Sequence, residues 1–288
     1  MLKDDIDSLS PARDFNRRSF VQTTVGSGFA AAVLPVTAQT VTTDTAGLEA
    51  GPVTIPVGDF AMPAYRAQPA GKQHLPVVLV ASEIFGVHEH IADVCRRFAK
   101  AGYLAIAPEL FVRQGNAGAY TEAARLIAEV VSKASDAQVM ADLDATVAWA
   151  AAQGGDTARL AITGFCWGGR TTWRYVAHNP RVAAGVAWYG PVARAYHPGD
   201  KTIVELAAAI KAPVLALYGA ADGGIPVETL TQLETALKAA GNLRSEFVVY
   251  PDTPHAFHAD YRPSYRKAAA EDGWKRCLAW LAVHGVKA

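Results

Sequence analysis

Short apolar runs alternate with segments of helical periodicity from Leu75 to the C-terminal end of the chain. A short run without polar alternation is typical of a strand that is covered on both faces, as in a parallel sheet. Helical segments between such runs indicate β-α-β units. The sequence therefore predicts an α/β fold with a mostly parallel central sheet and helices on both of its faces. The predicted strands are 77–80, 104–107, 160–163, 185–188, 214–217 and 247–250.

The segments between these strands have the spacing of apolar residues that is expected of helices. Residues 53–67, ahead of the first predicted parallel strand, could add one or two antiparallel strands at the edge of the sheet. In the segment 135–152, Asp142 and Asp144 lie between the apolar positions, so we interpret them as a solvated helix face and not as catalytic groups. The predicted helices are 89–101, 119–132, 135–152, 167–178, 202–210, 227–240 and 264–283.

The N-terminal part of the chain differs in composition from the rest. Arg17 and Arg18 precede a weakly apolar run from Phe20 to Val36, and small residues continue to Ala38. This arrangement resembles a twin-arginine export signal that is cleaved after Ala38. We expect export to the periplasm without stable membrane insertion after signal removal; because the run is short and polar for a spanning helix, a retained anchor is the weaker alternative. The expected boundaries are 1–38 for the signal peptide, 39–52 for a linker and 53–288 for the folded domain.

The charge balance excludes one class of partner. The chain has 27 Lys+Arg and 27 Asp+Glu, and 51% of its residues are hydrophobic. It therefore lacks the basic surplus with which proteins neutralise a nucleic-acid backbone. We expect a globular domain that does not bind nucleic acid.

The predicted strand 160–163 runs into Gly164-Phe165-Cys166-Trp167-Gly168, and a predicted helix follows. Gly-x-Cys-x-Gly at a strand-to-helix turn is the pattern of a nucleophile elbow with cysteine in place of serine. The glycines allow a close backbone approach, and the helix N-terminus favours a thiolate. The pattern predicts Cys166 as a nucleophile and the Trp167 N–H as a donor to an oxyanion. The alternative is a small buried cysteine in a tight turn.

An acid and a histidine follow later strands in the chain order that this kind of site uses. Asp222 follows the predicted strand 214–217, and His255 follows 247–250. Both residues would lie at the carboxyl ends of parallel strands, where open α/β sheets place their sites. This agreement favours a catalytic Cys166 over a structural one.

A metal site is not expected. His88 and His90 follow a predicted strand and could line the pocket, but two residues at this spacing do not share one helix face as metal ligands. The sequence offers no convincing set of ligands, and we predict neither a metal nor an organic cofactor.

These residues together resemble the dienelactone hydrolase family, which comprises cysteine members of the α/β-hydrolase superfamily. The resemblance implies the role of nucleophile for Cys166, of base and acid for His255, and of orienting partner for Asp222. It also implies that Glu83 lies beside the thiol and takes part in its activation when substrate binds, and that the Ile84 N–H completes the oxyanion hole. The motifs that carry the resemblance, within about residues 53–284, are Ser82–Gly86, Pro108–Phe111, Gly164–Gly169, Asp222 with Pro226, and His255–Phe257.

The chain departs from the best-known members of this family where they bind a substrate carboxylate with two arginines. Arg113 matches one of them, but the other position, four residues after His255, is Ala259. The serine next to the histidine is replaced by Ala256. His258, Tyr261 and Arg262 lie close enough in sequence to His255 to substitute for the missing arginine. The expected substrate-binding residues are Arg113, Phe85, Ala256, His258 and Arg262.

Two further cysteines, Cys95 and Cys277, fall on the apolar stripes of their predicted helices. In this superfamily the first and last helices cover the same face of the sheet, so a disulfide formed after export is one alternative. Two buried free thiols are the other, and the narrow geometry of a disulfide favours them.

We expect an enzyme that cleaves a lactone or small carboxylic ester through a thioester at Cys166, as a monomer or small homo-oligomer. A broad-specificity esterase with little preference for acidic substrates is the related alternative. An alternative of another class is a thiol sensor or ligand-binding protein without turnover, although binding alone does not require an oriented base.

Overall fold

The computed structural model describes residues 41–197 and 199–288, around one eight-stranded sheet with the order β1-β2-β4-β3-β5-β6-β7-β8. The strands from β3 to β8 are parallel, and β1 and β2 form an antiparallel hairpin at one edge. All six predicted strands and the antiparallel edge are thus confirmed. The strands are β1 (Leu48–Val57), β2 (Phe60–Pro69), β3 (Pro76–Ala81), β4 (Leu104–Pro108), β5 (Asp156–Phe165), β6 (Val182–Trp188), β7 (Val214–Gly219) and β8 (Glu246–Tyr250).

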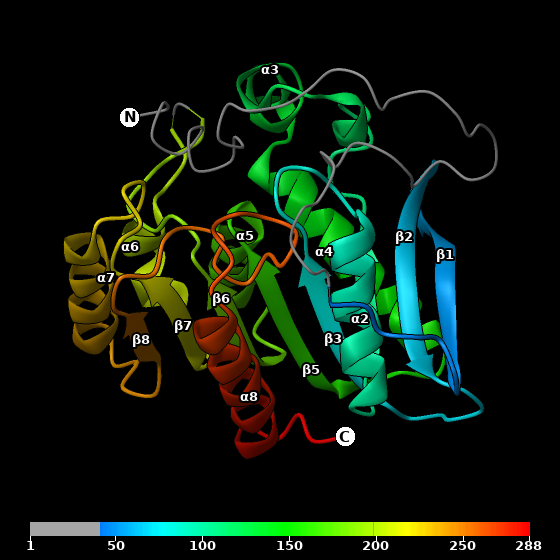
Figure 1. Cartoon of the computed structure of the whole chain (residues 1–288). Helices are drawn as coiled ribbons and strands as arrows, with labels where there is room; N and C mark the ends of the chain where they lie inside the picture. The colour runs from blue at the N-terminus through cyan, green and yellow to red at the C-terminus, as the bar shows by residue number, and fades with distance from the viewer. Residues whose placement is uncertain (1–40, 198) are drawn as a thin grey trace.

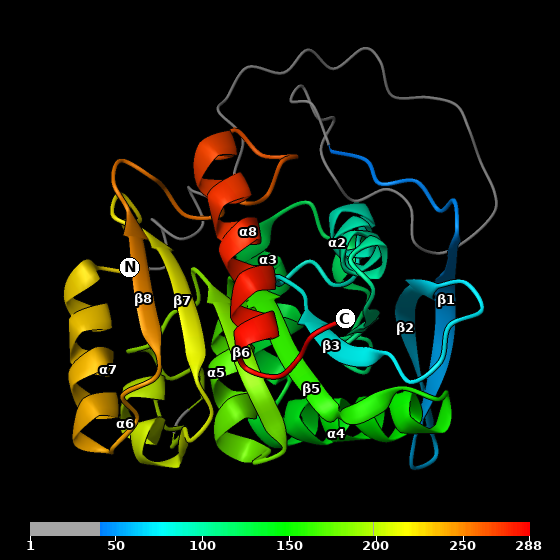
Figure 2. The same cartoon turned by 90° about the horizontal axis from the view of Figure 1, so that it is seen from below.

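Helices cover both faces of the sheet, as predicted. Figure 1 shows α2 and α8 in front of the strands and α4 and α5 behind them, and Figure 2 gives the same arrangement from below. In the described part of the chain no helix is long and apolar enough to cross a membrane. The helices are α2 (Glu89–Lys100), α3 (Ala123–Glu129), α4 (Asp136–Ala152), α5 (Trp167–His178), α6 (Ile203–Leu206), α7 (Val227–Ala239) and α8 (Lys267–Val283), with the 3-10 turns η1 (Ala117–Ala119), η2 (Val131–Lys133) and η3 (Ala207–Ala209).

Two predicted helices are interrupted. The segment 119–132 forms η1, α3 and η2 because Tyr120 and Glu122 have an extended backbone, which cannot continue a helix. The segment 202–210 divides into α6 and η3. Both segments are rich in alanine, whose strong helix propensity hides such interruptions.

The edge strand β1 begins at Leu48, inside the segment that we predicted to be a linker. Leu48 and Ala50 pack against the core and pair with Pro69 and Ala67 of β2. An edge strand needs only one buried face, and the small and polar residues around Leu48 do not show a clear alternation. The predicted signal peptide lies outside the described residues.

The parallel strands form the core. Every residue of β3, β4 and β7 is buried, as expected for strands that are covered on both faces. On the face covered by α2 and α8, Cys95 and Cys277 are buried free thiols, the alternative that disulfide geometry favoured. The carboxyl ends of these strands lead directly into the predicted site residues.

Candidate active site

Cys166 lies at a sharp turn between β5 and α5. Its backbone, with φ 55° and ψ −117°, is outside the regions that most residues adopt. The Cys166 N–H donates to the Trp188 carbonyl at 3.0 Å, which fixes the turn to the end of β6. The side chain is partly exposed. This strand–turn–helix geometry is the one predicted for a nucleophile elbow.

Gly164 and Gly168 allow the turn to close. A Cβ on Gly168 would lie 2.1 Å from the Ala81 carbonyl oxygen, and one on Gly164 would lie 2.2 Å from the Gly168 carbonyl oxygen. Both oxygens belong to backbone that cannot shift without moving a strand or a helix. The two positions therefore require glycine, as the sequence pattern indicates.

His255 interacts with both Asp222 and Cys166. Its Nδ1 lies 2.6 Å from Asp222 Oδ2, and Cys166 lies close enough to influence the pKa of the imidazole. Burial opposes a charged imidazole, but the interactions with Cys166 and with the Asp222 carboxylate outweigh it and raise the pKa of His255 well above its usual value. The other carboxylate oxygen, Asp222 Oδ1, accepts from the Gly224 N–H at 3.0 Å. The arrangement thus fixes the orientation of the imidazole through both oxygens of Asp222.

Trp167 and Ile84 carry the two N–H groups that we predicted for an oxyanion hole. Trp167 is the first residue of α5, and an N–H at this position has no acceptor within its own helix. Ile84 follows β3, the neighbour of β5 in the sheet, so Ile84 and Trp167 both follow the carboxyl ends of adjacent parallel strands. The Phe111 ring lies 4.5 Å from that of Trp167 and packs the indole in place.

Glu83 is fully buried after β3. Its Oε2 accepts from the Tyr261 hydroxyl at 2.5 Å and lies 3.3 Å from His88 Nε2. Burial alone would raise the pKa of Glu83, but the hydrogen bond from His88 and the charge of Arg262 outweigh it and hold the pKa below its usual range. Burial lowers the pKa of His88. The pair is therefore an ionised carboxylate with a neutral imidazole.

Arg262 brings a positive charge to these groups. Its guanidinium lies 4.9 Å from the centre of the Phe85 ring and 5.0 Å from that of Tyr261. The side chain is buried, and its charge acts on both Glu83 and Cys166. Of the residues predicted to bind substrate, the structure thus places Phe85 and Arg262 around Glu83.

Arg113 makes different contacts. Its Nη1 donates to Asp142 Oδ2 at 2.6 Å, and its guanidinium stacks at 4.2 Å over the Phe60 ring. Asp142 is fully buried, so our interpretation of this residue as part of a solvated face is wrong. Asp142 is buried against Arg113, which lies in the loop after β4. The periodicity of a helix cannot reveal a partner from a distant part of the chain. Asp144, in contrast, has a side chain that is 45% exposed.

His258 packs in the core. Its ring stacks on Phe165 at 4.9 Å and lies 4.6 Å from the Trp188 ring. Burial lowers the pKa of His258 well below its usual value, so the imidazole is neutral. These contacts pack His258 among aromatic rings, and its substrate-binding role stays a prediction. Ala256 is also buried, with a φ of 56° directly after His255.

Tyr189 lies beside His255, although the sequence analysis did not predict it as a site residue. It follows β6, and the edge of its ring faces His255 with the centroids 5.1 Å apart. Its hydroxyl is buried and has no hydrogen-bond partner among the described residues. Burial, and then the charge of Glu83, raises the pKa of Tyr189 well above its usual value. Its position at the carboxyl end of a parallel strand is the signal that could have identified it.

Glu109, after β4, holds the turn that carries Glu83 and Ile84. Its Oε1 accepts from the Val87 N–H at 2.8 Å. A Cβ on Gly86 would lie 2.6 Å from Glu109 Oε2, so the turn and the carboxyl are in close contact. Burial raises the pKa of Glu109 to about 7.

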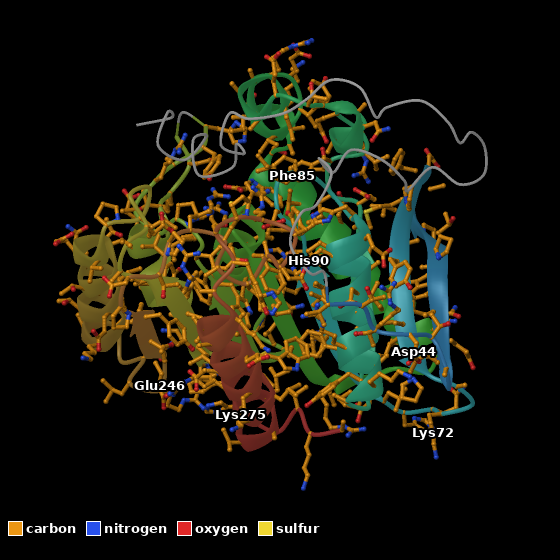
Figure 3. The ribbon with its side chains drawn as sticks, viewed as in Figure 1. Asp44, Lys72, Phe85, His90, Glu246 and Lys275 are labelled. Atoms are coloured by element: carbon orange, nitrogen blue, oxygen red, sulfur yellow. The ribbon has the colours of Figure 1, made fainter. Side chains whose placement is uncertain are left out.

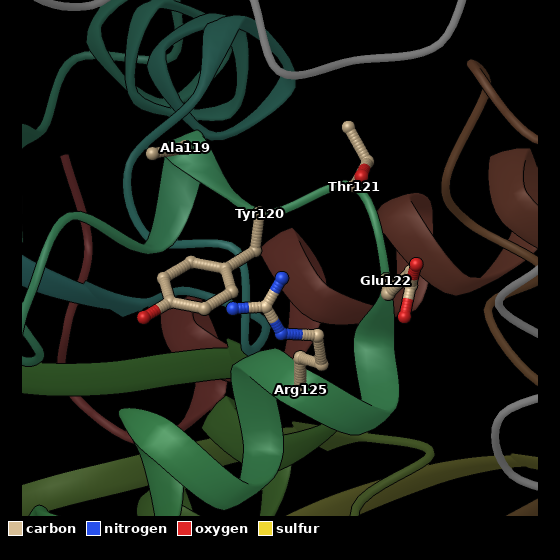
Figure 4. Close-up of a pocket in the computed structure, with 5 residues that line it drawn as sticks. All are labelled: Ala119, Tyr120, Thr121, Glu122 and Arg125. Atoms are coloured by element: carbon tan, nitrogen blue, oxygen red, sulfur yellow. The ribbon is translucent and has the colours of Figure 1, made fainter.

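A hollow of about 260 Å³ lies beside α3 and involves none of these residues (Figure 4). Across residues 41–197 and 199–288, no group of three or more His, Cys, Asp or Glu side chains is arranged to hold a metal ion. The residues that line the hollow are Ala119, Tyr120, Thr121, Glu122 and Arg125.

Comparison with solved structures agrees with this architecture. The crystal structure of a "putative dienelactone hydrolase" from Klebsiella pneumoniae is 54% identical in sequence and superposes with a TM-score of 0.79. The match covers 82% of this chain and 98% of that one. Its fold is the α/β-hydrolase fold, which the eight-stranded sheet and its two helical layers reproduce.

Sequence relatives give the family. A protein of Methylorubrum extorquens named "putative carboxymethylenebutenolidase" is 56% identical over 287 residues, which is 98% of each chain. An Escherichia coli protein of the same name is 50% identical over 272 residues, covering 92% of this chain and 98% of that one. The sequence profile of the Dienelactone hydrolase family matches residues 62–285. The chain therefore belongs to the dienelactone hydrolase family and is a hydrolase.

Proposed function

We propose that the protein hydrolyses a lactone or small carboxylic ester through a thioester at Cys166, with His255 and Asp222 as the other members of a catalytic triad. The observation that carries this proposal is the position of His255, which is hydrogen-bonded to Asp222 and lies close enough to Cys166 for the two to interact. A protein that only bound a ligand or sensed oxidants would not need an oriented base beside its thiol.

The reaction divides into two acyl transfers. The Cys166 sulfur, as a thiolate, attacks the carbonyl carbon, and the resulting oxyanion accepts from the N–H groups of Ile84 and Trp167. The bond between the carbonyl carbon and the ring or alkoxy oxygen breaks, and that oxygen takes a proton from His255. Water then gives a proton to His255 and attacks the thioester. The carbon–sulfur bond breaks, the carboxylic acid leaves, and the sulfur is again a thiolate.

Glu83 controls the charge next to Cys166 in this proposal. A carboxylate near the thiol opposes thiolate formation, so a shift of Glu83 on substrate binding activates the nucleophile. The bonds from Tyr261 and His88 hold Glu83 when no substrate is bound. Iodoacetamide should therefore alkylate Cys166 faster in a Glu83→Gln variant, and an unchanged rate would remove this role from the mechanism.

Arg262 is the residue that we expect to bind the carboxylate of an acidic substrate. It is buried among Glu83, Tyr261 and Phe85, whereas Arg113 is paired with Asp142. A Bradyrhizobium protein that is 30% identical to this chain is named "probable 2-oxo-3-(5-oxofuran-2-ylidene)propanoate lactonase", which supports an acidic lactone as the substrate. The pairing of Arg113 with Asp142 favours the second candidate, a broad esterase for uncharged substrates.

Steady-state hydrolysis of a dienelactone and of a neutral aryl ester tests the proposal. We expect turnover of the lactone by the wild-type protein, its loss in Cys166→Ala, and its retention in Cys95→Ala, which removes a buried thiol instead. A substrate with a slow second step should increase the mass of the protein by one acyl group, and only when Cys166 is present. Turnover of the aryl ester alone would select the broad esterase, and turnover that persists in Cys166→Ala would overturn the mechanism.

The proposal includes export of the protein to the periplasm. Its support is the pair Arg17 and Arg18 ahead of a short, weakly apolar run. Expression of the full chain in bacteria with and without a working twin-arginine transporter tests this. Appearance of the protein in the periplasm, only where the transporter works, is the expected result.

A further inference from the structure

Residues 41–46, which we call the N-terminal strap, cross α2 before the chain enters β1 (Figure 1). The Thr43 N–H donates to Asp93 Oδ1 at 2.5 Å, and Arg96 Nε donates to the Thr43 carbonyl at 2.8 Å. Asp93 and Arg96 are both buried. Charged groups of α2 therefore hold the strap through its backbone, and Lys100 adds an exposed ion pair with the Asp44 side chain at 2.7 Å.

Asp260 connects the strap to the loop that follows His255. Its Oδ2 accepts from the Val41 N–H at 3.1 Å and from Arg97 Nη2 at 2.9 Å, and its Oδ1 lies 3.1 Å from His90 Nδ1. The residue is 2% exposed. One buried carboxylate thus joins the strap, α2 and the loop that follows His255. Figure 3 labels His90, the residue of α2 that lies beside Asp260 Oδ1.

The same loop holds Glu83. Tyr261 directly follows Asp260, and its hydroxyl donates to Glu83 Oε2 at 2.5 Å. The Ala259 N–H donates to the Ala256 carbonyl, and the Arg262 N–H to the Ala259 carbonyl, each at 3.0 Å. Consecutive turns of this kind restrict independent movement of single residues. The position of Asp260 therefore determines where the Tyr261 hydroxyl meets Glu83.

We propose that Val41 is a positioning residue: its backbone N–H, acting through Asp260, fixes the loop that carries Tyr261 and so holds Glu83 in its resting position until substrate binds. This inference rests on the proposed function, because it assigns a task to the same Glu83. The Val41 side chain is 47% exposed, and only its backbone takes part. Without that N–H, Asp260 keeps its bonds to Arg97 and His90, so the loop loosens without leaving a buried charge unpaired.

The test removes the N–H of residue 41. Val41→Pro lacks the donor, whereas Val41→Ala retains it and serves as the matched variant. We expect iodoacetamide to alkylate Cys166 about fivefold faster in substrate-free Val41→Pro than in the wild type, because Glu83 is held less firmly beside the thiol. Val41→Ala should be alkylated at the wild-type rate.

A double-mutant cycle with Tyr261→Phe distinguishes positioning from general stabilisation. If the strap acts through Tyr261, Val41→Pro should raise the rate of Cys166 alkylation by less than about twofold in the Tyr261→Phe background. An equal increase in both backgrounds, or equal alkylation rates for the proline and alanine variants, would overturn the inference. Hydrolysis that survives Cys166→Ala would instead overturn the proposed function, so the two failures are distinguishable.

Discussion

The Arg113 guanidinium and the Asp142 carboxylate form an ion pair with an N–O distance of 2.6 Å. The arginine that the family resemblance assigns to a substrate carboxylate thus already binds a carboxylate of α4. Arg262, in contrast, lies beside Glu83 and Tyr261, and we proposed it above as the arginine for an acidic substrate.

Exchange of each arginine for methionine should separate the two roles. Arg262→Met should raise KM for a dienelactone roughly tenfold and KM for a neutral ester less than about threefold, because only the former substrate has a carboxylate to bind. Arg113→Met should leave both KM values within about threefold and lower stability by roughly 2 kcal/mol, since it leaves Asp142 buried without its partner. If instead Arg113→Met raised KM for the dienelactone and Arg262→Met did not, Arg113 would have to release Asp142 when substrate binds.

Gly168, two residues after Cys166, should be indispensable for stability. Gly168→Ala would bring a Cβ to within 2.1 Å of the Ala81 carbonyl, and relief of that clash would move β3 or α5. We expect a loss of at least about 3 kcal/mol in the free energy of unfolding. Gly223→Ala is the matched control, because no atom lies within 4 Å of its added Cβ, and it should change stability by less than about 0.5 kcal/mol. Urea denaturation of both variants gives the comparison.

Glu109→Gln should remove one source of pH dependence from the stability. The pKa of Glu109 is raised by burial from 4.5 to about 7, so between these values the folded protein holds a proton that the unfolded chain releases. The stability of the wild type therefore falls as pH rises through this window and is level above it. Glutamine does not ionise and keeps an acceptor for the Val87 N–H. The variant should gain roughly 2 kcal/mol relative to wild type between pH 5 and pH 8, and parallel stability curves would contradict the assignment.

Tyr189→Phe should affect catalysis and not folding. The hydroxyl is buried beside His255 with no hydrogen-bond partner among the described residues, so its removal breaks no hydrogen bond within that part of the chain. If it donates to bound substrate, kcat/KM should fall roughly fivefold while the melting temperature stays unchanged or rises. A lower melting temperature at constant kcat/KM would show that the hydroxyl has a structural partner instead.

The elements that the sequence predicts well carry their signal locally. The turn at Cys166 has its two glycines within five consecutive residues, and Asp222 and His255 each follow an apolar strand directly. Such patterns depend on backbone sterics and on strand order, both of which neighbouring residues express. The six parallel strands were found for the same reason.

The features that could not be predicted depend on distant partners. Asp142 is buried because Arg113 reaches it from another element, and the strap is ordered because buried charges of α2 and Asp260 bind its backbone. Backbone contacts leave no mark on the sequence of the segment that makes them. Tyr261 shows an intermediate case, since its nearness to His255 was visible but its bond to Glu83 required the fold.

The open edge of the sheet has a consequence for self-association. Among residues 41–197 and 199–288, β1 ends the sheet on one side, and an unpaired edge is a template on which a second chain can add a strand. Pro52 and Pro56 lie in this strand, opposite Tyr65 and Ala61 of β2, and proline has no N–H to donate. In an edge strand the missing N–H faces away from the neighbouring strand. Two donor positions are therefore absent from the edge that an incoming chain would need, and the protein is protected against aggregation by strand addition on this side.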